Sequence, residues 1–226
     1  MQSSKAIITP EGYPFIAYSV GLLLFLSAGA WLLSSSVLAV PAAIALLLTI
    51  FVISFFRNPE RSAPVDPSLI VAPADGTVVY VGPAEQEHLG DCQKISIFMS
   101  VFNVHVNRAP FSGTVVDRFY RKGKFYDARH AKASCENEQC GLVIELRPGF
   151  RLVCVQIAGL VARRILCYAE IGDQLERGNR YGMIRFGSRL DVYLPQGPKP
   201  LVSVGQKAVA GETPLVRYDA ADKEQR

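Results

Sequence analysis

Between Gly12 and Phe56 the chain contains no Asp, Glu, Lys or Arg, an uncharged run of 45 residues. As one straight helix, this run would extend roughly 68 Å, about twice the thickness of the hydrocarbon core of a membrane. Two helices of 20 residues fit instead, over residues 14–33 and 37–56, because three consecutive serines between them supply a polar turn. We therefore predict that residues 1–56 form a membrane-associated hydrophobic helical hairpin.

The charges that flank this hairpin predict its orientation. Lys5 precedes the first helix, Arg57 and Arg61 follow the second, and the serine turn has no charge. Because cytoplasmic loops of membrane proteins are rich in Lys and Arg, we expect both ends, and the domain that follows, on the cytoplasmic face of the cell membrane. Two alternatives stay open: a hairpin that dips into one leaflet, and a secretory signal cleaved near Ala28 and Ala30.

Residues 57–226 are expected to form a mainly β domain. From Leu69 onward, short runs of β-branched and aromatic residues alternate with Gly and Pro, without helical periodicity of comparable length. Pro148 and Gly149 predict a hairpin turn, and residues 121–137 a loop or short helix. The pattern favours a barrel-like or sandwich-like fold with some α+β character. The expected strands lie in VVYVG, KISIFMS, GTVVDRFY, GLVIEL, FRLVCVQI, RRILCYAE and LDVYL.

One internal similarity stands out within this domain. APADGTVV, from Ala72 to Val79, and APFSGTVV, from Ala109 to Val116, agree at six of eight positions. The similarity marks either two copies of one structural unit or simply two entries into strands, since Pro, Gly and β-branched residues are common there.

Net charge and cysteine content narrow the possible partners. A formal charge of +4 suits an anionic membrane surface or a phosphate-bearing substrate better than duplex DNA, so no nucleic-acid partner is expected. An odd number of cysteines, two of them in apolar runs, indicates reduced thiols; they are Cys92, Cys135, Cys140, Cys154 and Cys167. Cys135, Cys140 and His130 have a spacing at the loose end for zinc, and no metal is expected.

Several residues combine reactive chemistry with a suggestive setting, and each also has an ordinary explanation. Alternation within FNVHVNRAP places His105 on a polar strand face, where it needs a partner. Asp75, in PADG, is either a functional acid or a turn residue. Gly187-Ser188 is the only Gly-Ser dipeptide, and it marks either a reactive peptide bond or a turn between two strands. His130 is a possible phosphate ligand or a solvated loop residue.

Together, PADGTVV with Asp75, FNVHVNRAP with His105 and IRFGSRLDVYLP with Ser188, behind an apolar N-terminus, resemble the short form of the phosphatidylserine decarboxylase proenzymes. The resemblance covers about residues 57–218. It implies a pyruvoyl-dependent decarboxylase domain, residues 57–226, that cuts itself between Gly187 and Ser188. The products would be a large membrane-associated β chain, residues 1–187, and a small α chain, residues 188–226, held together as a heterodimer. Ser188 would become an N-terminal pyruvoyl group, so no diffusible cofactor would be required.

The resemblance also implies roles for these residues. The Ser188 hydroxyl attacks the Gly187 carbonyl to form an ester, which is then eliminated, and hydrolysis of the resulting dehydroalanine leaves the pyruvoyl group. This group forms a Schiff base with the amine of phosphatidylserine and accepts electrons as CO2 leaves, giving phosphatidylethanolamine. Either His105 or Asp75 would act as the base.

The chain departs from the longer bacterial enzymes at one position of the family's motif. Arg108 stands where those enzymes have a second histidine, and an arginine cannot act as a base near neutral pH. It can bind a phosphate or carboxylate of the substrate through two parallel hydrogen bonds. We therefore expect Arg108 to bind the substrate, together with His130 as the possible phosphate ligand.

A function of another class stays open. The C-terminal segment VGQKAVAGETPLVRY has the turn-rich rhythm of biotinyl and lipoyl modules, which suggests a non-catalytic membrane-anchored β-module. Lys207, however, is followed by Ala-Val and is not flanked by Met as such carriers require. An uncut chain would favour the module, and a cut chain would favour the enzyme.

Overall fold

The computed structural model describes residues 6–130, 132–160, 164–185 and 187–218. The chain divides into two compact units, Met1–Glu60 and Arg61–Arg226, which are described separately. The first unit is helical and the second is mainly β. The sheets of the second unit confirm the predicted mainly β fold class.

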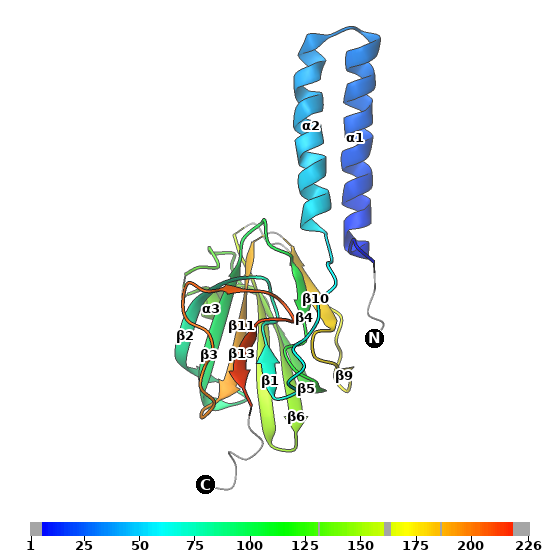
Figure 1. Ribbon diagram of the computed structural model, residues 1–226. Coiled ribbons are helices and arrows are strands. Elements are labelled where there is room, and N and C mark those ends of the chain that lie inside the picture. The colour runs from blue at the N-terminus through cyan, green and yellow to red at the C-terminus, as the bar shows by residue number, and fades with distance from the viewer. Residues whose placement is uncertain (1–5, 131, 161–163, 186, 219–226) are drawn as a thin grey trace. The chain divides into compact units, whose positions relative to one another are not determined.

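The first unit is a hairpin of two long helices (Figure 1). A single 3-10 turn, Pro10–Gly12, leads into α1, Tyr13–Leu32, and α2 follows over Ser36–Phe55. Both helices begin and end one residue before the predicted bounds. At the base of the hairpin, the rings of Phe15 and Phe56 stack at 5.3 Å. Both helices are long and apolar enough to cross a membrane, and their side chains are largely exposed, which is compatible with membrane association.

An antiparallel sheet of eight strands, in the order β12-β2-β3-β11-β7-β6-β5-β9, curls into a half-barrel in the second unit (Figure 1). Two smaller sheets, β4-β10-β8 and β1-β13, complete the unit. The elements are β1 Leu69–Val71, β2 Gly76–Gln86, β3 Gly90–Met99, β4 Val106–Arg108, β5 Gly113–Arg121, α3 Ala133–Glu136, β6 Gln139–Arg147, β7 Phe150–Ala158, β8 Arg164–Cys167, β9 Gln174–Leu175, β10 Arg180–Arg185, β11 Ser188–Pro195, β12 Lys207–Ala208 and β13 Pro214–Arg217.

Alternation along the strands divides the buried side chains between the two faces of the large sheet. Leu190 and Val192 of β11 enter the main core, together with Ile70 of β1 and Leu215 of β13. Tyr193 faces the other way, into a smaller cluster beneath the segment that contains α3. Each buried aliphatic side chain contributes about 1.5–3 kcal/mol. All seven predicted strands are found, as is the short helix expected within residues 121–137.

The internal sequence similarity corresponds to a repeated structural unit. Gly76 and Gly113 each begin the first strand of a hairpin, β2–β3 and β5–β6, and each pairs with a two-residue strand on the other side. A Cβ on either glycine would lie 2.2 or 2.6 Å from a backbone oxygen of the opposite strand. Both hairpins also shift register at the same step, after Val78 and after Val115. The structure therefore supports the interpretation as two copies of one unit.

Candidate functional site

Ser188 is the first residue of β11, in the middle of the large sheet. It is fully buried and lies opposite Met99 of β3 on one side and Ala158 of β7 on the other. Its hydroxyl lies 3.4 Å from the Met99 sulfur, which is a weak acceptor. Gly187, just before it, has a φ of +63°, in the left-handed region where glycine is favoured. The peptide bond between these two residues thus joins a half-buried glycine with a left-handed φ to a fully buried serine.

The Gly187 carbonyl lies against Gly159, which directly follows β7. A Cβ at position 159 would lie 2.3 Å from the Gly187 oxygen and 3.1 Å from its carbonyl carbon. Real Cβ atoms essentially never approach that closely, so only glycine leaves room for this carbonyl. Sequence reasoning missed Gly159, because its partner lies 28 residues away in the chain.

His105 lies next to Gly187, at the backbone nitrogen of that residue. Its ring is fully buried; Nδ1 lies 2.9 Å from the Asn103 carbonyl oxygen, and Nε2 lies 3.4 Å from the Gly187 nitrogen. A carbonyl only accepts, so Nδ1 carries the proton in the neutral ring and Nε2 has the lone pair. The structure therefore brings His105 and Gly187 together, with the basic ring nitrogen directed at residue 187.

Asp75 lies on the far side of β3 from Ser188, just before β2. One carboxylate oxygen pairs with Arg61 at 2.8 Å, and the other accepts a hydrogen bond from the Ala210 amide at 2.8 Å. In the second copy of the repeated unit, Ser112 occupies the same position and accepts a hydrogen bond from a backbone amide in the matching turn. These contacts give Asp75 a structural task, and its part in the chemistry stays a prediction.

Arg108, at the end of β4, is buried between two glycine turns. Its Nη1 donates to the Gly178 carbonyl at 2.9 Å, and its side-chain Cδ would lie 3.2 Å from a Cβ placed at Gly211. Burial, reinforced by the positive charge of Arg61, lowers the pKa of this guanidinium below its usual value. Substrate binding by Arg108 stays a prediction.

Two adjoining cavities share Asp127 and Leu160, and the smaller one reaches Gly187. The smaller, of about 140 Å³, includes Gly187, Gly159, Leu160 and Asp127 in its lining. The larger, of about 530 Å³, shares Asp127 and Leu160 and is also lined by Tyr126, His130 and Lys132. The structure thus places His130 in the lining of the larger cavity, and its substrate-binding role stays a prediction; sequence reasoning missed Asp127 and Leu160.

An ion pair between Asp127 and Arg129 places a negative and a positive charge side by side in the cavity lining. Arg129 donates to both carboxylate oxygens of Asp127 at 3.1 Å through Nε. The backbone carbonyl oxygen of Asp127 accepts a hydrogen bond from the His130 backbone N–H at 3.0 Å. Hydrogen bonds from Arg129 lower the pKa of Asp127 to about 2. The cavity therefore presents a fixed carboxylate next to a cationic side chain.

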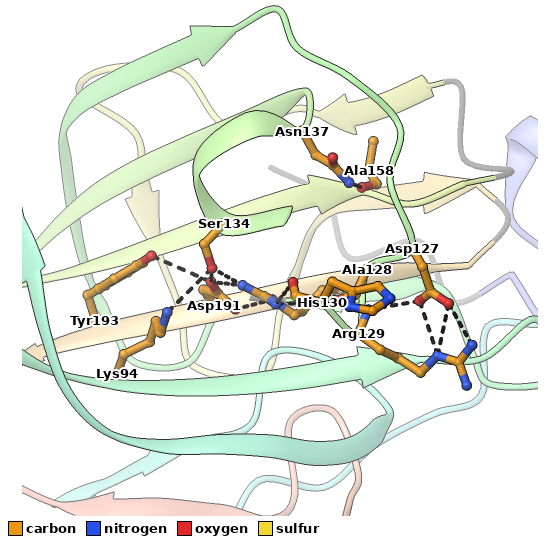
Figure 2. Close-up of polar contacts among 11 residues, drawn as sticks. Lys94, Asp127, Ala128, Arg129, His130, Ser134, Asn137, Ala158, Asp191 and Tyr193 are labelled. Atoms are coloured by element: carbon orange, nitrogen blue, oxygen red, sulfur yellow. Dashed lines mark hydrogen bonds and ion pairs between the residues drawn. The ribbon is translucent and has the colours of Figure 1, made fainter. Parts of the chain in front are cut away.

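The segment that lines these cavities is held against the sheet by a side chain of β11. Arg189 of that strand donates to Asp191 and to the His130 carbonyl. Figure 2 shows Asp191 and Ser134 near the cavity segment that includes His130. Arg189 and Asp191 form a buried ion pair at 2.8 Å. Neither residue was singled out from the sequence, because only the fold brings the cavity segment over β11.

The cysteines and the other possible metal ligands of the described residues do not gather at one site. All five cysteines are free. Across the described ranges, no three or more His, Cys, Asp or Glu side chains gather as a cluster that could hold a metal ion. Cys135 is exposed, whereas Cys140 is buried.

Comparison with known proteins assigns the chain to a family. Residues 48–216 match the phosphatidylserine decarboxylase family. A phosphatidylserine decarboxylase proenzyme of Trichlorobacter lovleyi is 77% identical over 217 residues, which cover 96% of this chain and 99% of the relative. Proenzymes of the same name from Geobacter sulfurreducens and Citrifermentans bemidjiense are 58% and 57% identical, each over 95% of this chain and 98% of the relative. The chain therefore belongs to the phosphatidylserine decarboxylase family.

Proposed function

We propose that the chain is a lyase that removes the serine carboxylate of phosphatidylserine as CO2 and leaves phosphatidylethanolamine. Family membership favours this function over a non-catalytic β-module. The single observation that supports it most is the setting of Gly187 and Ser188: the Ser188 hydroxyl is buried, Gly187 has a left-handed φ, and Nε2 of His105 lies 3.4 Å from the Gly187 nitrogen.

Self-cleavage uses the groups already in place. The Ser188 oxygen bonds to the Gly187 carbonyl carbon, and the C–N bond breaks, so the peptide becomes an ester and the nitrogen an amine. Removal of the Ser188 α-proton then expels Gly187 as a carboxylate and leaves dehydroalanine. Water replaces the nitrogen, which leaves as ammonia, and the residue becomes a pyruvoyl group. No external oxidant or reductant is needed, because the hydroxyl itself is lost as the leaving group.

His105 is the better supported base for these steps. Its Nε2 is the basic nitrogen of the neutral ring and lies at the Gly187 nitrogen, whereas Asp75 is engaged by Arg61 and the Ala210 amide. A positioned base contributes about 100- to 10,000-fold to a proton transfer. The Asn103 carbonyl fixes the ring so that this nitrogen stays directed at residue 187.

The surroundings of residue 188 also fit a pyruvoyl group. A small planar ketone fits where Ser188 now lies, because that position is buried between two strands and beside a cavity that reaches Gly187. When present, the group supplies a carbonyl that binds the substrate amine and accepts electrons as the carboxylate leaves. Burial excludes water from this point, and the strands on both sides of β11 keep residue 188 in place.

The larger cavity suits the phospholipid headgroup. A phosphodiester, a carboxylate and an ammonium group must be accommodated near residue 188, and His130 and Lys132 offer cationic or hydrogen-bonding contacts for the phosphate. The fixed carboxylate of Asp127 is available to the ammonium group. Acyl chains stay in the bilayer, so the helical hairpin would serve to keep the enzyme at the membrane, with the β unit on the cytoplasmic face.

The experiment is to purify the full chain in detergent and to supply phosphatidylserine that is labelled at the carboxylate carbon of its serine headgroup. We expect labelled CO2 and a small fragment of about 4 kDa, residues 188–226, whose N-terminus has the mass of a pyruvoyl group. Ser188→Ala should stay at full length and release no CO2, whereas the matched surface variant Ser203→Ala should behave as the unchanged chain. An intact chain that still releases CO2 would contradict the proposal.

A further inference from the structure

Arg189, the residue directly after the expected cleavage point, is almost fully buried, with 3% of its side chain exposed. Because successive strand residues face opposite sides of a sheet, Arg189 and Asp191 share the face of β11 opposite Ser188. Nε donates to one oxygen of Asp191 at 2.8 Å and Nη2 to the other at 2.9 Å. This bidentate pair fixes the plane of the guanidinium group.

The remaining donors of Arg189 reach the segment that lines the cavities. Nη1 donates to the Ala128 carbonyl at 3.2 Å and to the His130 carbonyl at 3.1 Å, and Nη2 donates to the Ser134 hydroxyl. Ser134 in turn donates to Asp191 at 2.9 Å, which closes the network (Figure 2). One side chain of β11 therefore holds residues 128, 130 and 134 against the sheet.

These contacts are made with the backbone of the cavity wall. Ala128 and His130 belong to the stretch that lines both cavities, and the smaller cavity includes Gly187 itself. Fixing the two carbonyls sets where the side chains of Asp127 and His130 point. Displacements as small as about 1 Å at such positions can change rates or affinities up to about 100-fold.

We propose that Arg189 is a positioning residue that holds the headgroup-binding wall, residues 127–130 and 132–134, in register with residue 188. The proposal rests on the proposed function. After cleavage, Arg189 would belong to the small chain and the wall to the large chain, so this network would join the two chains next to the reacting group. Lipid affinity should then depend on Arg189, although Arg189 faces away from the residue 188 side of the sheet.

Arg189→Lys is the sharpest test. A lysine keeps the positive charge beside Asp191 but lacks the planar fork that serves the carboxylate and two carbonyls together. We expect complete cleavage, a KM for phosphatidylserine in mixed micelles raised about tenfold, and a kcat within about twofold of the unchanged chain. The reaction of hydroxylamine with the pyruvoyl ketone should keep its rate, because so small a nucleophile does not need the wall.

Two further variants keep this test decisive. Ser134→Ala removes one anchor of the wall with little change in volume and should raise KM about threefold, even if Arg189→Lys fails to fold. Arg151→Lys alters a surface pair with Glu145 elsewhere on the sheet and should leave KM unchanged. An unchanged KM in Ser134→Ala and Arg189→Lys, or a fall in kcat alone, would overturn the role of Arg189. Failure of the unchanged chain to be cut or to release CO2 would instead contradict the proposed function.

Discussion

Replacing Gly159 by alanine should slow self-cleavage about 100-fold without unfolding the chain. The added methyl carbon would lie 2.3 Å from the Gly187 carbonyl oxygen, whereas ordinary contacts begin at 3.4 Å. Either the carbonyl or the end of β7 must therefore move by about 1 Å. A displacement of that size between reacting groups costs about 100-fold in rate, or about 2.7 kcal/mol of activation free energy.

The assay is a time course of cleavage on a denaturing gel, starting from newly synthesised full-length chain. Gly159→Ala should accumulate as uncut chain, with a half-life about 100-fold longer than that of the unchanged protein. Gly159 does not have a left-handed φ, so alanine there brings no strain of that kind. Gly21→Ala is the matched control, because a Cβ at that position meets nothing within 4 Å. Equal cleavage half-lives for Gly159→Ala and the unchanged chain would refute the reasoning.

Three further substitutions test other parts of the site. His105→Asn should slow cleavage at least roughly 100-fold, as measured on the same gels, because it removes the ring nitrogen at Gly187; normal cleavage would exclude His105 as the base. Asp127 has a pKa lowered to about 2, so its stabilising effect is complete above the unfolded value of 3.8 and is lost only as pH falls towards 2. Asp127→Asn should therefore leave the shape of the kcat/KM profile unchanged between pH 5 and 9, and loss of an acidic limb would contradict this. Arg61→Met should lower the free energy of unfolding by about 2–3 kcal/mol in denaturant titrations, because it leaves Asp75 largely buried without this ion pair; a change below about 0.5 kcal/mol would show that the pair is not stabilising.

Much of the fold could be predicted because it depends on local patterns. The uncharged run and its serine turn were sufficient to locate α1 and α2 within one residue at each end. Runs of β-branched residues located the longer strands in the same way. The two-residue strands β9 and β12 could not be found, because they exist only through pairing with Gly113 and Gly76 from distant parts of the chain.

The site was predictable only in part, for a related reason. Ser188 and His105 could be singled out from their local settings and the family resemblance, and the fold brings His105 to the Gly187 nitrogen. The space at Gly159 and the network of Arg189 depend on which segments cross one another, which no local pattern specifies. Asp75 has a structural task that the sequence did not reveal, its contacts with Arg61 and a backbone amide, and its part in the chemistry stays a prediction.

The location of β11 decides what a break before Ser188 would do to the molecule. Eight of its residues are in register with β3 and six with β7, and Leu190, Val192 and Leu194 are fully buried. Withdrawing residues 188–226 would open the sheet along two edges and expose that core to water. After cleavage, residues 188–226 would thus stay paired with both neighbouring strands of the large chain. Isotopically distinct preparations should therefore not exchange their small fragments when mixed.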